Sequence, residues 1–213
     1  MTLTKTRIKP KKTEGETLPV MELFYSVQGE GAHTGKAAFF IRLAGCDVGC
    51  HWCDVKDSWD ADKHPVMSVK DIVEEVGLSG ANRVIVTGGE PAMYDLTHLT
   101  TSLKKLGLAV HLETSGSSEV RGAFDWICLS PKKRKEPWEE VFSKADELKV
   151  VIYNKDDFNW AEKNAALVSK KCKLYLQPEW SKADKVMPLI VEYTKKHPRW
   201  QVSLQTHKYL GIR

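Results

Sequence analysis

The sequence of 213 residues has no apolar run that approaches the roughly 20 residues of a membrane-spanning helix. Its mean hydropathy is −0.37, and its opening, MTLTKTRIKPKKTEGE, lacks the apolar core of a secretory signal. Internal repeats are also absent. We therefore exclude collagenous and disordered classes, expect no membrane contact, and expect a cytoplasmic globular protein of ordinary composition, with 42% hydrophobic and 28% charged residues.

The body of the chain has little excess charge of either sign. The formal net charge is +4, but Lys5, Arg7, Lys9, Lys11 and Lys12 stand together with no acid among them. Without this group, basic and acidic residues nearly balance, whereas a nucleic-acid-binding domain carries a basic stripe on its folded surface. We expect no nucleic-acid partner, a basic flexible tail over residues 1–18, and a single domain over residues 19–213.

Short apolar runs alternate with helical patterns from a first β-like run near Pro19 onward. Leucines at three- and four-residue steps from Leu96 to Leu106 predict a helix that stops at Gly107, and Ser68 is expected to cap another. This alternation predicts an α/β fold with about six parallel strands, in an open doubly wound sheet or a partial barrel. The expected strands are 37–43, 83–86, 108–112, 126–129, 148–153, 174–176 and 201–204, and the other helices are 69–76 and 186–193, with Pro188 near the helix start.

The cysteines are few, and their number, five, is odd. Without an export signal, such a count favours a reducing compartment, where clustered thiols bind metal more often than they pair. The segment FIRLAGCDVGCHWCDV places Cys46, Cys50 and Cys53 directly after an expected strand. Three such thiolates hold a [4Fe–4S] cube with one open iron, which S-adenosylmethionine can chelate. The alternatives are a disulfide pair, a buried structural trio, and a zinc site completed by His51 or by a distant cysteine.

Polar motifs follow three of the expected strands at the ends where ligands collect in parallel sheets. The motif TGGEP spans residues 87–91; its glycines permit close approach of a ligand, and its carboxylate can hold an ammonium group. The motifs ETSG (113–116) and SPK (130–132) follow the next two strands. The glycine pair alone is typical of a tight turn, but the three motifs together predict a shared site.

The combination of CDVGCHWC with TGGEP resembles the radical S-adenosylmethionine superfamily. The opening FYSVQGEGAHTGKAAFFIRLAGC, then ETSG, SPK, LQP and the closing QTHKYLGI, are similar to one family within it, the 7-carboxy-7-deazaguanine synthases. The resemblance runs from about Met21 to Arg213. It implies a single-domain partial (β/α) barrel of the radical SAM type, which works as a homodimer and receives electrons from an external donor such as flavodoxin.

The resemblance also implies a carbon–nitrogen lyase reaction. Members of the family convert 6-carboxy-5,6,7,8-tetrahydropterin into 7-carboxy-7-deazaguanine with loss of ammonia, on the route to queuosine. A 5′-deoxyadenosyl radical abstracts a hydrogen from the substrate, the substrate radical contracts its ring, and hydrogen return regenerates S-adenosylmethionine.

Site roles follow from the same resemblance. The three clustered cysteines ligate the [4Fe–4S] cluster, Glu90 takes the ammonium group of S-adenosylmethionine, and Arg42 anchors the substrate carboxylate. The cofactor-binding positions are Trp52, Asp54, Gly88, Gly89, Glu90, Ser130, Pro131, Lys132 and Gln177. The substrate-binding positions are Val27, Gln28, Gly29, Glu30, Arg42, Thr87 and His207.

One position departs from the family pattern. Family members commonly read Cys-Asp-Thr after the cluster, and that threonine hydroxyl reaches a magnesium ion that also holds the substrate. This chain reads Cys53-Asp54-Val55, and valine has no oxygen to offer a hard cation. Asp54, or the substrate with water, could still hold Mg²⁺; we expect a weak or absent magnesium requirement.

Two other functions are compatible with the cysteine spacing. A glycyl-radical-enzyme activase has a similar size and cysteine pattern, and it would form a tight complex with a large protein partner. A zinc-stabilised binding module would be colourless and would need no open coordination position. We expect Cys128 and Cys172 to be small hydrophobic core residues in either case.

Overall fold

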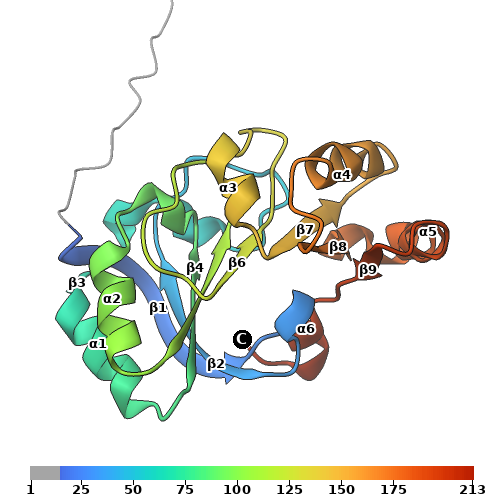
Figure 1. Cartoon of the computed structure of the whole chain (residues 1–213). Helices are drawn as coiled ribbons and strands as arrows, with labels where there is room; N and C mark the ends of the chain where they lie inside the picture. The colour runs from blue at the N-terminus through green and yellow to red at the C-terminus, as the bar shows by residue number, and fades with distance from the viewer. Residues whose placement is uncertain (1–14) are drawn as a thin grey trace, which may run out of the picture.

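In the computed structural model, which describes residues 15–213, nine strands form one sheet in the order β3-β1-β2-β4-β5-β6-β7-β8-β9 (Figure 1). All neighbours from β2 to β9 are parallel, whereas β1 pairs antiparallel with β2 and β3. The seven parallel strands correspond to the seven strands expected from the apolar runs. The strands are β1 (Thr17–Val27), β2 (Ala37–Leu43), β3 (Val66–Ser68), β4 (Arg83–Gly88), β5 (Ala109–Thr114), β6 (Trp126–Leu129), β7 (Glu147–Ile152), β8 (Lys173–Pro178) and β9 (Trp200–Val202).

The prediction of a single α/β domain with a mainly parallel sheet is confirmed, and helices connect most of the parallel strands. Among residues 15–213, no helix is both long and apolar enough to cross a membrane. The expected basic tail falls mostly on residues 1–14, outside the described residues. The helices are α1 (Val69–Leu78), α2 (Thr97–Lys105), α3 (Glu139–Lys144), α4 (Asp157–Ala165), α5 (Ala183–Lys196) and α6 (Thr206–Leu210), with short 3-10 turns between several elements.

Some element boundaries differ from the prediction for identifiable reasons. Strand β1 begins at Thr17, before the expected start near Pro19, because Thr17 pairs with Ser68 of the short strand β3. The hydroxyl of Ser68 accepts a hydrogen bond from the Asp71 amide, as expected for a helix cap. In α5, Pro188 lies inside the helix and not in its first turn. The proline removes one backbone hydrogen bond from the helix.

The two faces of the parallel strands differ, because successive side chains of a strand point to opposite faces. One face is apolar and packs against the helices, as shown by the fully buried Val84, Val86 and Leu112. The stripe of α2 contributes Leu99 and Leu103 to this core, but Leu106 follows the helix and is half exposed. The opposite face carries many polar side chains along β5, β7 and β8. The polar face is where a ligand site can form.

The two ends of the sheet are tied together by the connection between β1 and β2, residues 28–36. The Ala32 amide donates to Glu147 of β7 at 3.1 Å, and the Gly31 amide donates to Ser203, which follows β9, at 3.0 Å. The Thr206 amide of α6 donates to the Gly29 carbonyl at 2.9 Å. In Figure 1 the red C-terminal segment accordingly lies beside the blue β1–β2 hairpin. Residues 28–36 therefore cross the polar face of the sheet and cover a central cavity.

Candidate active site

A cavity of about 310 Å³ opens at the carboxyl ends of the parallel strands. Its lining includes side chains or backbone from β2, β4, β5, β7 and β8, from the cysteine loop, and from residues 28–36. Nearly all residues expected to bind ligands line this one cavity; Glu90 and Pro131 lie outside it. The lining residues among those expected are Val27, Gln28, Gly29, Glu30, Arg42, Cys46, Cys50, Trp52, Cys53, Asp54, Thr87, Gly88, Gly89, Ser130, Lys132, Gln177 and His207.

The cysteine loop, residues 45–53, is a tight backbone structure that follows β2. Gly45 and Gly49 have positive φ angles of 95° and 65°, which permit the sharp turns on either side of Cys46. The Cys46 amide is held by the Trp59 carbonyl at 3.2 Å, and the Cys53 amide by the Cys50 carbonyl at 3.1 Å. The three cysteines are only partly buried and are free. The loop thus presents three thiols to the cavity from a fixed backbone.

The donor set suits a cluster better than a structural zinc ion. Three free cysteine thiols on one loop line the cavity, whereas a structural zinc site is closed by four ligands. In a cube, by contrast, each thiolate binds a different iron atom. Burial raises the pKa of both the Cys46 and the Cys50 thiol, so that ligation has to displace their protons. The residues present fit a [4Fe–4S] cluster.

The absence of a side chain at Gly88 and Gly89 is required for close packing as well as for access of a ligand. A Cβ atom at Gly88 would overlap the Leu43 carbonyl, and Gly88 has a φ of 148°. A Cβ atom at Gly89 would overlap the Gly45 carbonyl and lie 2.9 Å from the Cys46 Cβ. The amides of Gly89 and Glu90 donate to Leu43 and Gly45 at 2.9 and 2.8 Å. The missing side chains therefore let the end of β4 lie directly against the cysteine loop.

Glu90 is buried behind the cavity wall, with an exposed fraction of 1%. Its carboxylate accepts hydrogen bonds from the Ala92 amide at 2.9 Å, the Ser115 amide at 2.7 Å, and the hydroxyls of Thr114 and Ser115. Thr114 and Ser115 themselves line the cavity. Direct binding of an ammonium group by Glu90 would require some of these contacts to open. In this structure, Glu90 holds the ends of β4 and β5 together.

The SPK motif lies against the cysteine loop. The ammonium group of Lys132 donates to the Ser130 carbonyl and hydroxyl at 2.7 and 2.6 Å and lies 5.6 Å from the centre of the Trp52 ring. Burial lowers the pKa of Lys132. The Pro131 carbonyl faces away from the cavity and accepts a long hydrogen bond, 3.5 Å, from Trp160. Lys132 and Trp52 together form a cationic and aromatic corner beside the thiols.

Arg42 lies near the end of β2 and also lines the cavity. Its Nε donates to Glu22 at 2.9 Å, and its guanidinium carbon lies 5.7 Å from the centre of the Phe24 ring. Among the described residues, neither Nη group of Arg42 has a protein partner. This fork is the part of arginine that binds a carboxylate in a bidentate manner. Arg42 pairs in register with Thr87 of β4, so both reach the same level of the cavity.

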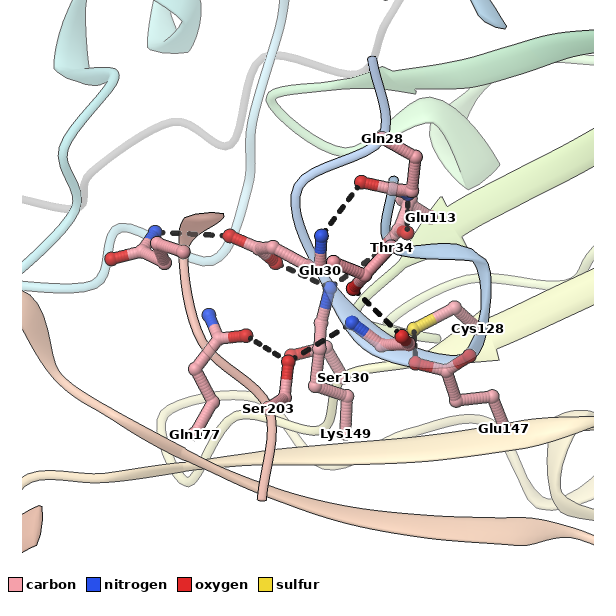
Figure 2. Close-up of polar contacts among 12 residues, drawn as sticks. Gln28, Glu30, Thr34, Glu113, Cys128, Ser130, Glu147, Lys149, Gln177 and Ser203 are labelled. Carbon is pink, nitrogen blue, oxygen red and sulfur yellow. Dashed lines mark hydrogen bonds and ion pairs between the residues drawn. The ribbon is translucent and has the colours of Figure 1, made fainter. Parts of the chain in front are cut away.

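A network of charged and amide side chains occupies the remaining wall, as Figure 2 shows. The Lys149 ammonium lies 2.5 Å from Glu30 and 2.8 Å from Glu113, and the Gln28 amide donates to Glu113 at 3.0 Å. The Gln205 amide donates to Glu30 at 3.0 Å. We call Glu113, Lys149, residues 28–36 and residues 203–208 the substrate wall, and the cysteine loop with residues 88–90 and 114–115 the cofactor wall.

His207 of α6 completes the substrate wall. A Cβ atom at Gly29 would overlap the His207 ring and lie 2.8 Å from its Cβ atom, so this close packing depends on the glycine. Burial lowers the pKa of His207, which keeps the ring neutral at neutral pH. Gln177 accepts from Ser203 at 2.8 Å, and Ser203 in turn accepts from the Gly31 amide. Gln177 therefore also supports residues 28–36.

Glu113 and Lys149 line the cavity but are absent from the residues predicted to bind ligands. Glu113 belongs to the ETSG motif, which predicts a site at the strand end but no particular role for this residue. Lys149 stands inside an apolar run expected to be a buried strand. A lysine in such a run is unfavourable unless it is paired, and that conflict is the signal that could have identified it.

The residues after the cluster do not fit a magnesium ion. Val55 lines the cavity without an oxygen atom to offer. Asp54 is more than half exposed, and its carboxylate already pairs with the Lys208 ammonium at 2.8 Å. The Lys208 ammonium group thus lies beside Asp54, the carboxylate that immediately precedes Val55.

Comparisons with known proteins identify the family. A model of the radical SAM superfamily matches residues 40–127. The 7-carboxy-7-deazaguanine synthase of Flavobacterium psychrophilum is 57% identical over 93% of this chain and 94% of its own length, and that of Synechocystis sp. is 48% identical over 92% and 93%. The chain belongs to the 7-carboxy-7-deazaguanine synthase family. A crystal structure of QueE from Escherichia coli also matches, with a TM-score of 0.82, 32% identity, and coverage of 92% of this chain and 99% of that one.

Family membership confirms several predictions. The fold is that of the radical SAM family, the enzyme class is a lyase, and the activity belongs to queuosine biosynthesis. The family uses a [4Fe–4S] cluster and S-adenosylmethionine and acts on a small molecule. The activase and the zinc-module alternatives are therefore set aside.

Proposed function

We propose that this protein converts 6-carboxy-5,6,7,8-tetrahydropterin into 7-carboxy-7-deazaguanine with release of ammonia. One observation carries the proposal: a thiol loop for a cluster and an unpaired arginine fork for a carboxylate lie in the same cavity. The cavity also gathers amide, carboxylate and imidazole groups that suit a planar ring rich in donors and acceptors. The product name of the relatives supports the same reaction.

On the cofactor wall, Cys46, Cys50 and Cys53 would hold the [4Fe–4S] cluster, which would supply the electron for reductive cleavage of S-adenosylmethionine. Gly88 and Gly89 present backbone to the methionine end of the cofactor, and Glu90 acts by fixing Thr114 and Ser115. Ser130, Lys132, Gln177 and Asp54 are further cofactor contacts, and Trp52 offers its ring to the adenine base.

On the substrate side, Arg42 anchors the carboxylate and Thr87 lies beside it. Val27, Gln28 and Gly29 contact the pterin edge through backbone and amide groups, together with Glu30. Neutral His207 closes the cavity over the ring and offers either a donor or an acceptor. Closure by α6 excludes water from the radical steps, which protects reactive species from side reactions.

The test is anaerobic reconstitution with iron and sulfide, followed by incubation with S-adenosylmethionine, dithionite and the carboxytetrahydropterin. We expect 7-carboxy-7-deazaguanine in the mass spectrum for the wild type and none for Cys50→Ala. A brown protein that cleaves S-adenosylmethionine but forms no deazapurine from this substrate contradicts the proposal.

We further propose that catalysis does not require Mg²⁺, because Val55 offers no oxygen atom and the Asp54 carboxylate is already paired with Lys208. After chelation, activity is expected to stay within about twofold when magnesium is returned, since hard cations need oxygen ligands. Val55→Thr provides the matched comparison, because it restores the hydroxyl. A steep and saturable magnesium requirement in the wild type rules this proposal out.

The remaining assignments are a homodimer, an external electron donor such as flavodoxin, and a cytoplasmic location. The exposed apolar side chains of Leu204, which follows the edge strand β9, and of Leu210 and Ile212 in the C-terminal segment support self-association. The exposed His51 shows that the cysteine loop reaches the surface, where a donor can approach. The free cysteines support a reducing compartment. Sedimentation analysis and reduction assays with flavodoxin test the first two.

A further inference from the structure

Lys149 is a charged side chain in the middle of the sheet, and the roles above leave it without a function. It stands on β7, its side chain is only 5% exposed, and both chain neighbours, Leu148 and Val150, are fully buried on the helix-facing side. Its ammonium group reaches two carboxylates, Glu30 at 2.5 Å and Glu113 at 2.8 Å (Figure 2). Lysine is almost never buried in this way unless its charge is paired.

The two carboxylates are held on their other oxygen atoms as well. Gln28 donates to Oε1 of Glu113 at 3.0 Å, and Gln205 donates to Oε1 of Glu30 at 3.0 Å. The side-chain oxygen of Gln28, Oε1, accepts a hydrogen bond from the Glu30 backbone amide at 3.1 Å, which completes a ring of contacts. The ring joins β5, β7, residues 28–36 and the segment before α6. Lys149 is the member that contacts both acids.

The charges of this group do not cancel. One ammonium faces two contacting carboxylates, so the set carries a net negative charge at the cavity surface. Burial by itself would raise the pKa of Glu30, but the charge and hydrogen bond of Lys149 and the hydrogen bond of Gln205 lower it to about 2. Burial by itself would lower the pKa of Lys149, but the surrounding acidic groups raise it well above its usual value. Both Glu30 and Lys149 are therefore ionised at neutral pH.

Glu30, Glu113 and Lys149 all line the cavity that the proposed substrate enters. A pterin ring carries an amino group beside a ring N–H, and such a pair of donors matches the two oxygens of a carboxylate. Each carboxylate oxygen has two lone pairs, so the internal hydrogen bonds leave acceptor capacity toward the cavity. The acids can meet the donor edge of the ring only if both keep their charge and orientation.

We propose that Lys149 is a positioning residue for substrate binding, which holds Glu30 and Glu113 side by side as ionised acceptors for the N–H edge of the substrate ring. This inference rests on the proposed function, because it takes its substrate from there. Without the ammonium group, the two carboxylates repel each other in a poorly hydrated site. One of them then binds a proton or turns away, and the acceptor array is lost.

The test compares Lys149→Met with the wild type in steady-state turnover at saturating S-adenosylmethionine. We expect the KM for the carboxytetrahydropterin to rise by about 100-fold, because the pair of ionised acceptors for the ring is lost when the acids are no longer held by the ammonium group. The dissociation constant of S-adenosylmethionine and the cluster absorbance are expected to stay unchanged. Lys149→Arg keeps the charge and is expected to recover most of the loss.

Two further variants separate positioning from a general loss of structure. Lys173→Met is the matched control, because Lys173 stands on the neighbouring strand β8 outside the cavity lining; its KM is expected to equal that of the wild type. Glu30→Gln combined with Lys149→Met removes the repulsion, and we expect a lower KM than in Lys149→Met alone. If Lys149→Met does not fold, the double variant is compared with Glu30→Gln, and we expect similar KM values because Lys149 then has no repulsion between acids to offset.

The outcomes distinguish this inference from the proposed function. A wild type that does not convert the pterin overturns both. A wild type that does so, while Lys149→Met lowers kcat and bound cluster without raising the KM, overturns only the role of Lys149. A double variant no better than Lys149→Met also contradicts it, because repulsion between the acids would then not be the cause.

Discussion

The two walls of the cavity contain buried acids that are stabilised in opposite ways. On the cofactor wall, Glu90 is surrounded by neutral donors from residues 24 and 25 positions away, at the end of the neighbouring strand. On the substrate wall, Glu30 is held by a cation 119 positions away and by an amide 175 positions away. The cofactor wall therefore depends on local strand pairing, whereas the substrate wall depends on ionisation and on the complete fold. The predictions below either perturb one wall or compare the two.

The largest effect is expected from Gly89→Ala on the cofactor wall. A Cβ atom there overlaps the Gly45 carbonyl, which is backbone and cannot rotate away, so the cysteine loop has to move. We expect reconstituted iron to fall severely and turnover to drop by more than about 100-fold, because small displacements of reacting groups are costly. Iron analysis and product assays measure both.

Gly77→Ala is the control for this variant. Gly77 lies in α1, and a Cβ atom there would meet only the Leu106 side chain at 3.8 Å. Iron content and turnover should match the wild type, and stability should rise by about 0.5–1 kcal/mol, the usual gain from replacing a helical glycine. Normal iron content in Gly89→Ala would show that the loop does not depend on this close packing.

Two single variants, Glu90→Gln and Glu30→Gln, are compared in order to separate the contributions of the two walls. An amide at position 90 replaces an acceptor by a donor among groups that are themselves donors, which costs about 1–3 kcal/mol for each buried group left unpaired. We expect Glu90→Gln to weaken S-adenosylmethionine binding about tenfold and Glu30→Gln to raise the KM for the pterin about tenfold. Equilibrium binding and steady-state kinetics provide the two readouts. Equal effects of both variants on both ligands would mean that the walls are not independent.

A smaller effect is expected in the pH dependence of stability. The pKa of Glu30 is lowered from 4.5 to about 2, so its ionised form stabilises the folded state above about pH 4.5. This contribution, on the order of 3 kcal/mol for a shift of this size, is lost as the pH falls through about 2. Urea unfolding of the metal-free protein between pH 6 and 2.5 measures it. Glu30→Gln should show a shallower decline; an unchanged decline would place the acid sensitivity elsewhere.

The sequence predicted the cofactor wall better than the substrate wall, for a physical reason. Strands β2 and β6 match their expected bounds, and the cysteine loop follows β2 as expected, because apolar runs and glycine turns are local signals. The contacts of Glu30 and Lys149 depend on how far residues 28–36 cross the sheet, which no local pattern encodes. Strand β3, only three residues long, was likewise missed because it is set by its pairing with β1.

The course of chain synthesis gives a further consequence of the link between residues 28–36 and the segment after β9. The contacts of Gly29, Glu30 and Gly31 with Thr206, Gln205 and Ser203 span more than 170 positions. A nascent chain can therefore pair β2, β4 and β5 and form the cysteine loop long before the substrate wall exists. Assembly of the substrate wall has to wait for residues 203–207, which makes it the slow, high-contact-order part of folding. Binding of the pterin thus requires the complete fold, whereas incorporation of the cluster does not.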